Sequence, residues 1–249
     1  DRTEEIALNF QRKNNLFKLI VNKKRLGKAL SYNLGKLRIE SDYLVSLDAD
    51  VKLSTDTFET LFNSIKSYQD LVAVRCFPQR KAKWNVASLG SMGSYYLISE
   101  MGRIYPLYSA RGPLLVLSRR LYSEVTLPDA PGTDQFMYWS CRARNMNFFF
   151  SKQSVVYYFV PTRIRDYFKQ NKRDVIARAF QKKYFGEDLI KRESPSPLNT
   201  LKILFKTLYH HPLYIISWLL LFTTSRAPLM SNRSTKTVSG KWGVAKSTK

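Results

Sequence analysis

The sequence predicts an α/β fold with an apolar helical segment near its C-terminal end, and three observations support this. Short runs of branched and aromatic apolar residues alternate with stretches of helical spacing along most of the chain. One of these runs stops abruptly at two aspartates, as a strand does at its carboxyl end. The alternation ends at the Ser-Pro-Ser-Pro linker of residues 194–197, and a strongly apolar stretch follows. With 249 residues, 44% of them hydrophobic, the chain can bury a sizeable core.

The first third of the chain gives helix and strand signals in αβ order. An amphipathic helix with acidic residues in its first turn opens the chain, and a short branched run of strand character follows it. The run Tyr43–Leu47 is interpreted as a buried parallel strand because it is mostly apolar and ends at Asp48. We therefore expect helices at residues 1–10, 27–35 and 53–65, and strands at 17–21, 43–47 and 71–76.

The helix and strand signals are weak at residues 78–112 and become clear again from residue 114 onward. Residues 78–112 carry three glycines among aromatic residues and predict a mixture of helix and loop. A turn-rich stretch at 128–133 precedes a helix whose Phe136, Trp139 and Ala143 can share one face. Strands are expected at 114–117, 148–150 and 155–160, and a strongly basic helix at 164–185.

The apolar segment near the C-terminal end favours contact with a membrane surface. Residues 212–224 carry no charge, but they fall short of the ~20 apolar residues that a comfortable span requires. Basic residues flank both ends, so an interfacial or re-entrant helix is expected, with Tyr209, Tyr214 and Trp218 at headgroup depth. The alternative is a terminal helix packed on the core of its own domain.

The charge balance requires a polyanionic partner or surface. Lys and Arg number 41 against 19 Asp and Glu, which gives a formal net charge of +22. Nucleic acid, acidic lipid headgroups and phosphorylated substrates are all compatible with this excess. Cys76 and Cys141 lie far apart without metal-ligand spacing, which indicates two buried thiols and fits a reducing compartment.

Asp48-Ala49-Asp50 is the sharpest local signal for chemistry. Two carboxylates spaced one residue apart after a strand offer hard oxygen ligands to Mg²⁺ or Mn²⁺, and such a metal would bridge the phosphates of a donor. The alternative is a solvated turn that happens to contain two acids, because this short pattern is common by chance. The strand before it favours the metal-binding interpretation.

Other candidate residues carry weaker signals. Asp134 follows a turn and opens a helix, so it is a candidate general base, or simply an acid favoured by the helix dipole. Lys28 after Gly27 could present a cation to phosphate at a helix start, or lie in an ordinary loop. The basic helix could contact a diphosphate, or be a solvated charged face, and its candidate residues are Gln170, Lys172, Arg173 and Arg178.

Taken in order, these segments resemble the GT-A fold glycosyltransferases of family 2. The opening helix resembles the one that follows the family's acidic nucleotide-binding segment, and the Gly-Lys-Ala of residues 27–29 with Asn33 is similar to a second family element. Asp48-Ala49-Asp50 resembles the family's metal-binding motif. The later segments that resemble the family are Gly112 with Arg119-Arg120, Thr133-Asp134, Gln170 to Arg173, and Trp242 with the closing basic residues.

The resemblance implies a GT-A (Rossmann-like) mixed sheet flanked by helices and an inverting, metal-dependent transfer of sugar. The donor would be a nucleotide-diphosphate sugar, and the acceptor a lipid-linked or glycan hydroxyl. Asp134 would be the base, Asp48 and Asp50 would hold Mg²⁺ or Mn²⁺, and the donor would contact Lys28, Asp48, Gln170 and Arg173. Asp174 stands where polymer synthases have Trp, so transfer of a single sugar is favoured over polymer synthesis. Thr133 replaces the first acid of a pair, which leaves Asp134 to act alone.

The resemblance also divides the chain and suggests a location. Residues 1–193 would form the catalytic domain, whose first strand would precede Asp1; residues 194–230 would form a membrane-associated helical segment, and 231–249 a basic tail. The expected location is the cytoplasmic face of a membrane, with no nucleic-acid partner. Two alternatives remain open at this point: a basic nucleic-acid-binding module, and a catalytically inactive transferase fold that binds glycans.

Overall fold

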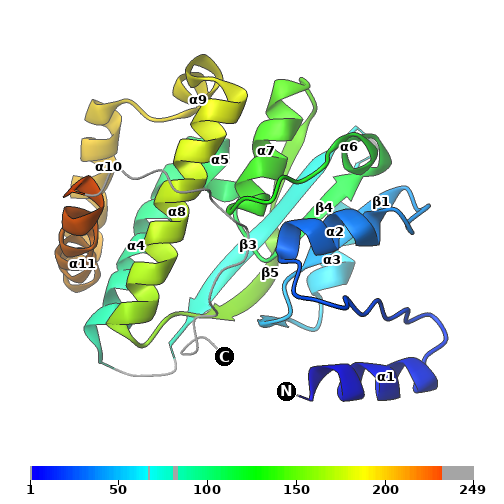
Figure 1. Cartoon of the computed structure of the whole chain (residues 1–249). Coiled ribbons are helices and arrows are strands. Elements are labelled where there is room, and N and C mark those ends of the chain that lie inside the picture. The colour runs from blue at the N-terminus through cyan, green and yellow to red at the C-terminus, as the bar shows by residue number, and fades with distance from the viewer. Residues whose placement is uncertain (1, 67, 81–83, 232–249) are drawn as a thin grey trace.

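A five-stranded mixed sheet lies at the centre of the molecule (Figure 1). The computed structural model describes residues 2–66, 68–80 and 84–231. The strand order is β1-β4-β3-β5-β2. β4 is antiparallel to both β1 and β3, β3 is parallel to β5, and β2 is antiparallel to β5. The strands are β1 (Tyr43–Leu47), β2 (Val51–Leu53), β3 (Leu71–Gln79), β4 (Leu114–Ser118) and β5 (Phe148–Phe159).

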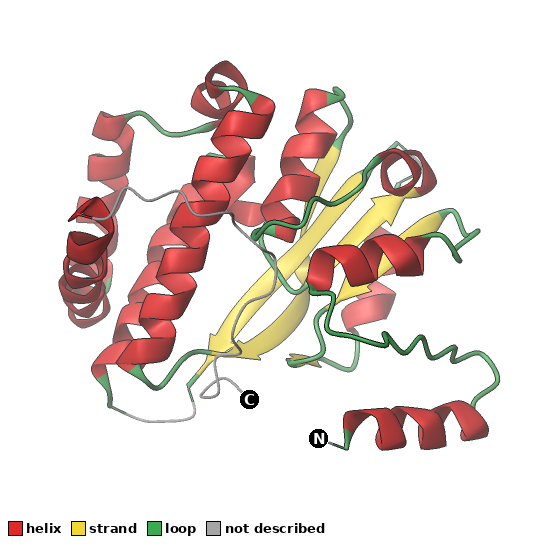
Figure 2. Cartoon of the chain, in the orientation of Figure 1, coloured by secondary structure: helices red, strands yellow, loops and turns green. Residues whose placement is uncertain are grey.

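Helices cover both faces of this sheet (Figures 1 and 2). In the first half of the chain they are α1 (Thr3–Lys13), α2 (Lys28–Lys36), α3 (Thr57–Ser64), α4 (Val86–Gly102), α5 (Pro106–Ser109) and α6 (Arg119–Glu124). In the second half they are α7 (Thr133–Ala143), α8 (Ile164–Phe185), α9 (Glu187–Glu193), α10 (Pro197–His210) and α11 (Pro212–Ser231). The expected α/β fold of mixed sheet and flanking helices is thus confirmed.

The core follows from the two-residue period of the central strands. In β3 and β4 every second residue packs into one cluster with side chains of α2, α6 and α7, and the residues between them pack into a second cluster with Leu61 of α3. Leu71 and Leu117 belong to the first cluster, and Val72 and Val116 to the second. Because both faces of β3 and β4 are covered, these strands are continuous apolar runs, which is why the sequence predicts them correctly.

Several predicted elements differ from the structure. Residues 17–21 form no strand; they lie in the segment that joins α1 to α2, where no described strand runs alongside to supply a hydrogen-bonding ladder. The strands expected at 148–150 and 155–160 are one strand, β5, whose ladder with β3 is interrupted by an irregularity between Val74 and Arg75. The weak pattern at 78–112 contains α4, the 17-residue helix Val86–Gly102.

The interpretation of Tyr43–Leu47 as a buried parallel strand is wrong in two respects. β1 pairs with the antiparallel strand β4, and it lies at one edge of the described sheet. Only Leu44 is fully buried, because an edge strand has a neighbour on one side alone. β1 does run in the same direction as β3 and β5, so its carboxyl end still opens on the edge of the sheet where the predicted site residues follow.

α11 packs closely against α4, and two glycines allow the approach. A Cβ atom at Gly93 would lie 2.2 Å from the carbonyl oxygen of Tyr214, and one at Gly90 would lie 2.6 Å from a methyl group of Leu221. The Tyr214 ring lies against that of Tyr96 in α4, and Trp218 packs against the cluster that contains Leu97 and Met101. The side of α11 that carries Tyr214 and Trp218 therefore faces α4, as in the alternative of a helix packed on its own domain. Among the described residues, no helix combines the length and apolar character needed to cross a membrane. The basic tail at 232–249, with Trp242, lies outside the described residues.

The close approach at Gly93 predicts a stability effect. Gly93→Ala is expected to lower the free energy of unfolding by about 1–3 kcal/mol, because the new methyl group meets backbone atoms that cannot rotate away. Denaturant unfolding would measure it. Gly35→Ala is the matched control, since a Cβ there has nothing within 4 Å and a helix-interior alanine stabilises by about 0.5–1 kcal/mol. Equal stability of the Gly93→Ala chain and the unchanged chain would contradict the packing of α11 on α4.

Candidate active site

Asp48 follows β1 directly and is held against the turn that precedes β4. Its backbone N–H donates to the carbonyl oxygen of Pro113 over 2.7 Å. The side chain of Asp48 is half-buried, and the chain then turns through Ala49 and Asp50 into β2, which pairs with β5. The carboxyl end of β1 therefore presents both predicted carboxylates at one end of the sheet.

Lys28 lies beside Asp48, as the predicted donor site requires. Lys28 is the first residue of α2, and its Nζ donates to Oδ1 of Asp48. About half of the Lys28 side chain is exposed, so solvent screens this pair and its contribution to stability is small. An exposed ammonium next to a carboxylate remains available to an anionic ligand.

Asp134 lies in the first turn of α7, at a position set by two glycines. Gly132 caps α7 with φ 77°, and its carbonyl oxygen accepts a hydrogen bond from the side-chain amide of Gln181 in α8 over 3.1 Å. Gly112 N–H donates to Oδ2 of Asp134 over 3.4 Å. Gly112 has φ 143°, and a Cβ there would lie 2.4 Å from the Cys76 Sγ, so only glycine fits this turn.

Asp48 and Asp134 meet at the turn formed by residues 111–113. The backbone N–H of Asp48 contacts Pro113 and the carboxylate of Asp134 contacts Gly112, while the Cys76 Sγ lies 3.6 Å from the carbonyl oxygen of Arg111. Burial, and then the charges of Asp134 and Asp48, raise the pKa of Cys76 to about 12. The structure brings together Lys28, Asp48 and Asp134 from three separate segments of the sequence.

A groove of about 660 Å³ adjoins this site between the sheet and helices α4, α5 and α8. Cys76 and Arg111 line its end nearest the carboxylates, and Gln170 lines it from α8. Its lining also carries hydroxyl groups and aromatic rings that can contact a polar ligand, among them Ser91, Ser94, Tyr95, Tyr108, Ser109 and Tyr158.

Gln170 and Arg173 are close in the sequence, but they lie on different faces of α8. Tyr167, Gln170, Asn171 and Asp174 have the i, i+3, i+4, i+7 spacing of one helix face, and all four line the groove. Arg173 lies off that face; its guanidinium lies 3.9 Å from Asp174 and is half exposed. Arg173 is therefore not among the residues of the groove, although Gln170 is.

Two residues at the site have no counterpart among the predicted ones. Cys76 is the sixth residue of β3, and Arg111 immediately precedes Gly112. The Arg111 guanidinium lies over the ring of Tyr108 at 5.7 Å, and its buried Nε has no hydrogen-bond partner among the described residues. The position before Gly112 was the only available signal for Arg111, and nothing in the pattern around Cys76 singles it out.

A comparison with models of protein families identifies the family of the chain. The family model described as glycosyl transferase family 2 matches residues 1–126, half of the chain. The chain belongs to glycosyl transferase family 2. The matched part contains Lys28, Asp48, Asp50 and Gly112, and Asp134 and α8 lie beyond it.

The similarity to one solved mannosyltransferase structure supports a GT-A-like fold for this family 2 chain. The mannosyltransferase PcManGT from Pyrobaculum calidifontis, solved with GDP-Man and Mn²⁺, matches 93% of the chain at 14% identity and a TM-score of 0.55. S. aureus TarS 1–349 matches 95% of the chain at 14% identity and a TM-score of 0.47. The chain spans 66% and 63% of these two structures. No curated protein matches its sequence.

The carboxylates of Asp48 and Asp50 fit a divalent cation whose remaining ligands are substrate phosphates and water. Among the described residues, no group of three or more His, Cys, Asp or Glu side chains could hold a metal alone. Mg²⁺ commonly binds through one or two carboxylates and completes its shell with substrate phosphates and water. Asp50 is exposed, and its carboxylate has no hydrogen bond or ion pair with a described residue, so it is free to coordinate. Asp48 and Asp50 supply the oxygen ligands that such a cation prefers.

Proposed function

We propose that this chain carries the active site of an inverting, metal-dependent glycosyltransferase of the hexosyltransferase type. The observation that supports this most directly is that the backbone of Asp48 and the carboxylate of Asp134 both contact the turn at residues 111–113. One carboxylate thus follows the strand that ends in the aspartate pair, and another lies at the start of α7 beside the same turn. A donor phosphate and an acceptor hydroxyl can meet between them.

Asp134 acts as the general base in this proposal. Its carboxylate takes the proton from the acceptor hydroxyl, and the resulting oxygen nucleophile attacks the anomeric carbon of the donor sugar. The new C–O bond forms on one face while the bond to the diphosphate breaks on the other, so the configuration at the anomeric carbon inverts. The electron pair leaves on the nucleotide diphosphate, and the proton stays on Asp134 until solvent accepts it. The Gly112 N–H steadies one carboxylate oxygen of Asp134 in the position this step needs.

The donor in this proposal is a nucleotide-diphosphate sugar. PcManGT was solved with GDP-Man, and its fold resembles that of this chain. Lys28 offers the diphosphate an exposed ammonium at the start of α2, and Asp48 positions that ammonium. Gln170 lies in the adjoining groove, where its amide can contact the bound substrates. Arg173 does not line that groove, and its half-exposed guanidinium lies beside Asp174, so the proposal rests on Lys28 and Asp48 for the donor contacts.

Mg²⁺ or Mn²⁺ would be held by Asp48 and Asp50 together with the donor phosphates. When bound, such an ion neutralises the charge that develops on the diphosphate. Lys28 adds to that neutralisation from the side of α2, and Asp50 stays exposed for the ion to reach.

The acceptor in this proposal is a lipid-linked or glycan hydroxyl, and the enzyme works at the cytoplasmic face of a membrane. The hydroxyl groups and aromatic rings of the groove beside Asp134 are suited to a sugar. Both cysteines are free thiols, which fits a reducing compartment, and the net charge of +22 favours an anionic lipid surface.

A donor screen tests the proposal. The protein would be incubated with a panel of nucleotide-diphosphate sugars, with and without Mn²⁺ and with and without membranes, and nucleotide-diphosphate release measured. Release from one donor that requires the metal supports the proposed function. Donor binding without any release in every combination would instead indicate an inactive glycan-binding fold. Salt-dependent binding to DNA or RNA without donor binding would indicate the nucleic-acid-binding alternative.

The position of Lys28 predicts a loss of donor affinity. Lys28→Met is expected to raise the KM for the donor about tenfold, because a hydrogen bond to a charged group contributes about 1.5–3 kcal/mol and partial exposure favours the lower end. Steady-state kinetics with varied donor would measure it. Lys13→Met, the same substitution at the exposed end of α1, serves as the control. An unchanged donor KM in Lys28→Met would remove Lys28 from the donor site.

A further inference from the structure

The outer faces of α10 and α11 carry two exposed apolar stripes. In α10 the exposed apolar residues are spaced i, i+3, i+7, i+11, and in α11 they are spaced i, i+3, i+7, so each set lies on one side of its helix. The stripes consist of Leu198, Leu201, Phe205 and Tyr209 in α10, and Leu213, Ile216 and Leu220 in α11. Phe205 is 62% exposed and Tyr209 is 85% exposed. We call these seven residues the outer stripe.

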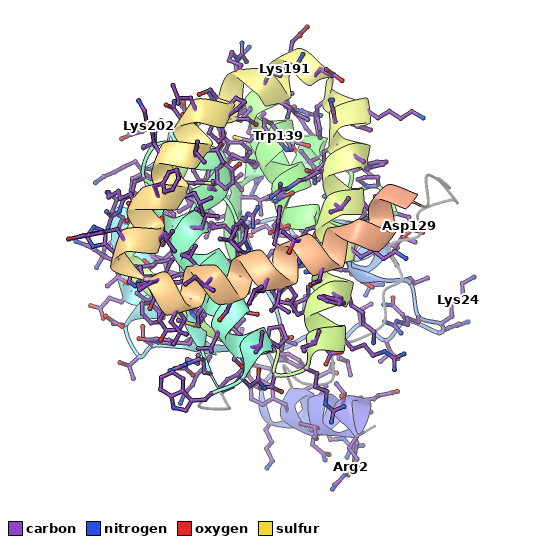
Figure 3. The ribbon with its side chains drawn as sticks, turned by 90° about the vertical axis from the view of Figure 1, so that its left-hand side faces the viewer. Arg2, Lys24, Asp129, Trp139, Lys191 and Lys202 are labelled. Carbon is purple, nitrogen blue, oxygen red and sulfur yellow. The ribbon has the colours of Figure 1, made fainter. Side chains whose placement is uncertain are left out.

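The outer stripe does not take part in the core, because other faces of α10 and α11 pack against the rest of the chain. The opposite faces of the two helices bury Ile203 and Thr207 of α10 and Ile215 and Leu221 of α11. Leu97 and Met101 of α4 belong to the same buried cluster as Ile203 and Ile215, so each helix already has its packing partner within the chain. Figure 3 looks onto α10 and α11 from the side away from the sheet. No residue of the outer stripe lines the groove beside the candidate site.

The charged residues within α10 and α11 are all basic. α10 and α11 contain no Asp or Glu. Lys202 lies between Leu201 and Ile203, is exposed, and makes no ion pair with a described residue. Lys206 is exposed one position after Phe205 and pairs with Glu100 of α4. Acidic groups that would repel a negatively charged surface are therefore absent from these helices.

We propose that the outer stripe docks on the surface of an anionic lipid bilayer, with α10 and α11 lying in the plane of the headgroups. Exposed Leu, Ile and Phe side chains next to lysine, without acids, are the composition that interfacial helices use. A nucleic acid presents phosphates and base edges and would not bury aliphatic side chains. The net charge of +22 adds long-range attraction to acidic headgroups. This inference specifies the membrane partner of the proposed function and does not depend on the transfer chemistry.

The structure changes which aromatic residues would meet the lipid. Tyr214 lies against Tyr96 of α4, and Trp218 packs against the cluster that contains Leu97 and Met101, so they cannot also insert into a bilayer while α11 stays in place. Tyr209, which the sequence already places at headgroup depth, is well exposed, and Phe205 of the same stripe joins it. The surface therefore uses α10 as much as α11, which the apolar run of the sequence alone does not indicate.

Vesicle sedimentation tests this docking. The chain would be mixed with vesicles of equal parts phosphatidylcholine and phosphatidylglycerol, and with phosphatidylcholine vesicles, at low and high salt. We expect strong partitioning onto the anionic vesicles that weakens with salt. The double variant Leu201→Ser with Phe205→Ser is expected to lower the partition coefficient about tenfold or more, since two apolar side chains no longer enter the bilayer. Phe62→Ser on α3, whose Phe is 52% exposed, is the matched control and should partition unchanged.

Three outcomes would overturn the docking surface. The first is equal partitioning of the double variant and the unchanged chain. The second is partitioning onto neutral and anionic vesicles to the same extent at both salt concentrations. The third is a loss of self-association in the double variant on gel filtration without vesicles, which would show that a second copy of the chain covers the stripe. Donor-dependent release of nucleotide diphosphate, measured in detergent, tests the proposed function separately. Release without vesicle binding would contradict the docking surface and leave the proposed function intact.

Discussion

Asp134→Asn is expected to lower the rate of sugar transfer by roughly 10²- to 10⁴-fold, the range that general bases contribute. Asparagine keeps the size of the side chain and can still accept the Gly112 N–H, but it cannot take a proton from the acceptor. The KM for the donor should change little, because Lys28 and Asp48 hold the donor side of the site. Steady-state kinetics with varied donor and acceptor would measure both parameters.

The same residue has a simpler explanation, as an acid favoured by the N-terminus of α7. That role is worth only about 0.3–1 kcal/mol of stability and no catalytic rate. Asp188→Asn makes the same substitution in the first turn of α9 and is the matched control. If Asp134→Asn and Asp188→Asn both shift the melting temperature slightly and leave the transfer rate unchanged, Asp134 is structural and the base must be sought elsewhere in the groove.

The sequence predicted the strands that are covered on both faces. It failed where a strand forms, or takes its direction, only through hydrogen-bonded pairing with another strand. The first four residues of β3 and of β4 are apolar and buried because helices pack on both of their faces, and that composition is visible in the chain. The direction of the neighbour of β1 is not visible, because it depends on β4, which lies far along the chain. Residues 17–21 have strand composition but no described partner, and a strand without a ladder does not form.

The candidate site could be predicted in part because two of its residues sit at the starts or ends of elements. Asp48 follows a strand and Asp134 starts a helix, and these positions are recognisable from apolar runs and turn residues. Membership of a helix face is harder to recognise when most of the helix is polar. In α8 the groove-lining face carries Gln170, Asn171 and Asp174, so no apolar stripe marks this face. The sequence groups Arg173 with Gln170, but Arg173 does not line the groove.

The packing of α11 left only a faint signal in the sequence. Gly90 and Gly93 stand three residues apart in α4, and that spacing lets another helix approach closely. Their partner, α11, follows after more than a hundred residues, and no local pattern connects the two. The apolar run at 212–224 therefore favours membrane contact over packing on its own domain, whereas one side of the run packs on α4.

Asp50→Ala is expected to lower the transfer rate by roughly 10²- to 10³-fold, because a bound divalent cation supplies several kcal/mol of charge stabilisation and each 1.36 kcal/mol is tenfold. The concentration of Mn²⁺ needed for half-maximal activity should rise as well, since one of two carboxylate ligands is lost. Asp50 is suited to this role because it is exposed and pairs with no described residue. Activity measured over a series of Mn²⁺ concentrations would give both quantities.

The control for this prediction lies at the opposite end of the same strand. Asp42 precedes β1 as Asp50 follows it, and its side chain is 86% exposed and pairs with Arg119. Both substitutions remove one surface carboxylate, so a general effect of net charge on an already basic chain would appear equally in each. A rise in the Mn²⁺ requirement confined to Asp50→Ala locates the metal at the carboxyl end of β1. Normal binding of Mn²⁺ by Asp50→Ala, followed by electron paramagnetic resonance in the presence of donor, would instead remove Asp50 from the metal site and leave Asp48 with the donor phosphates as the remaining candidate ligands.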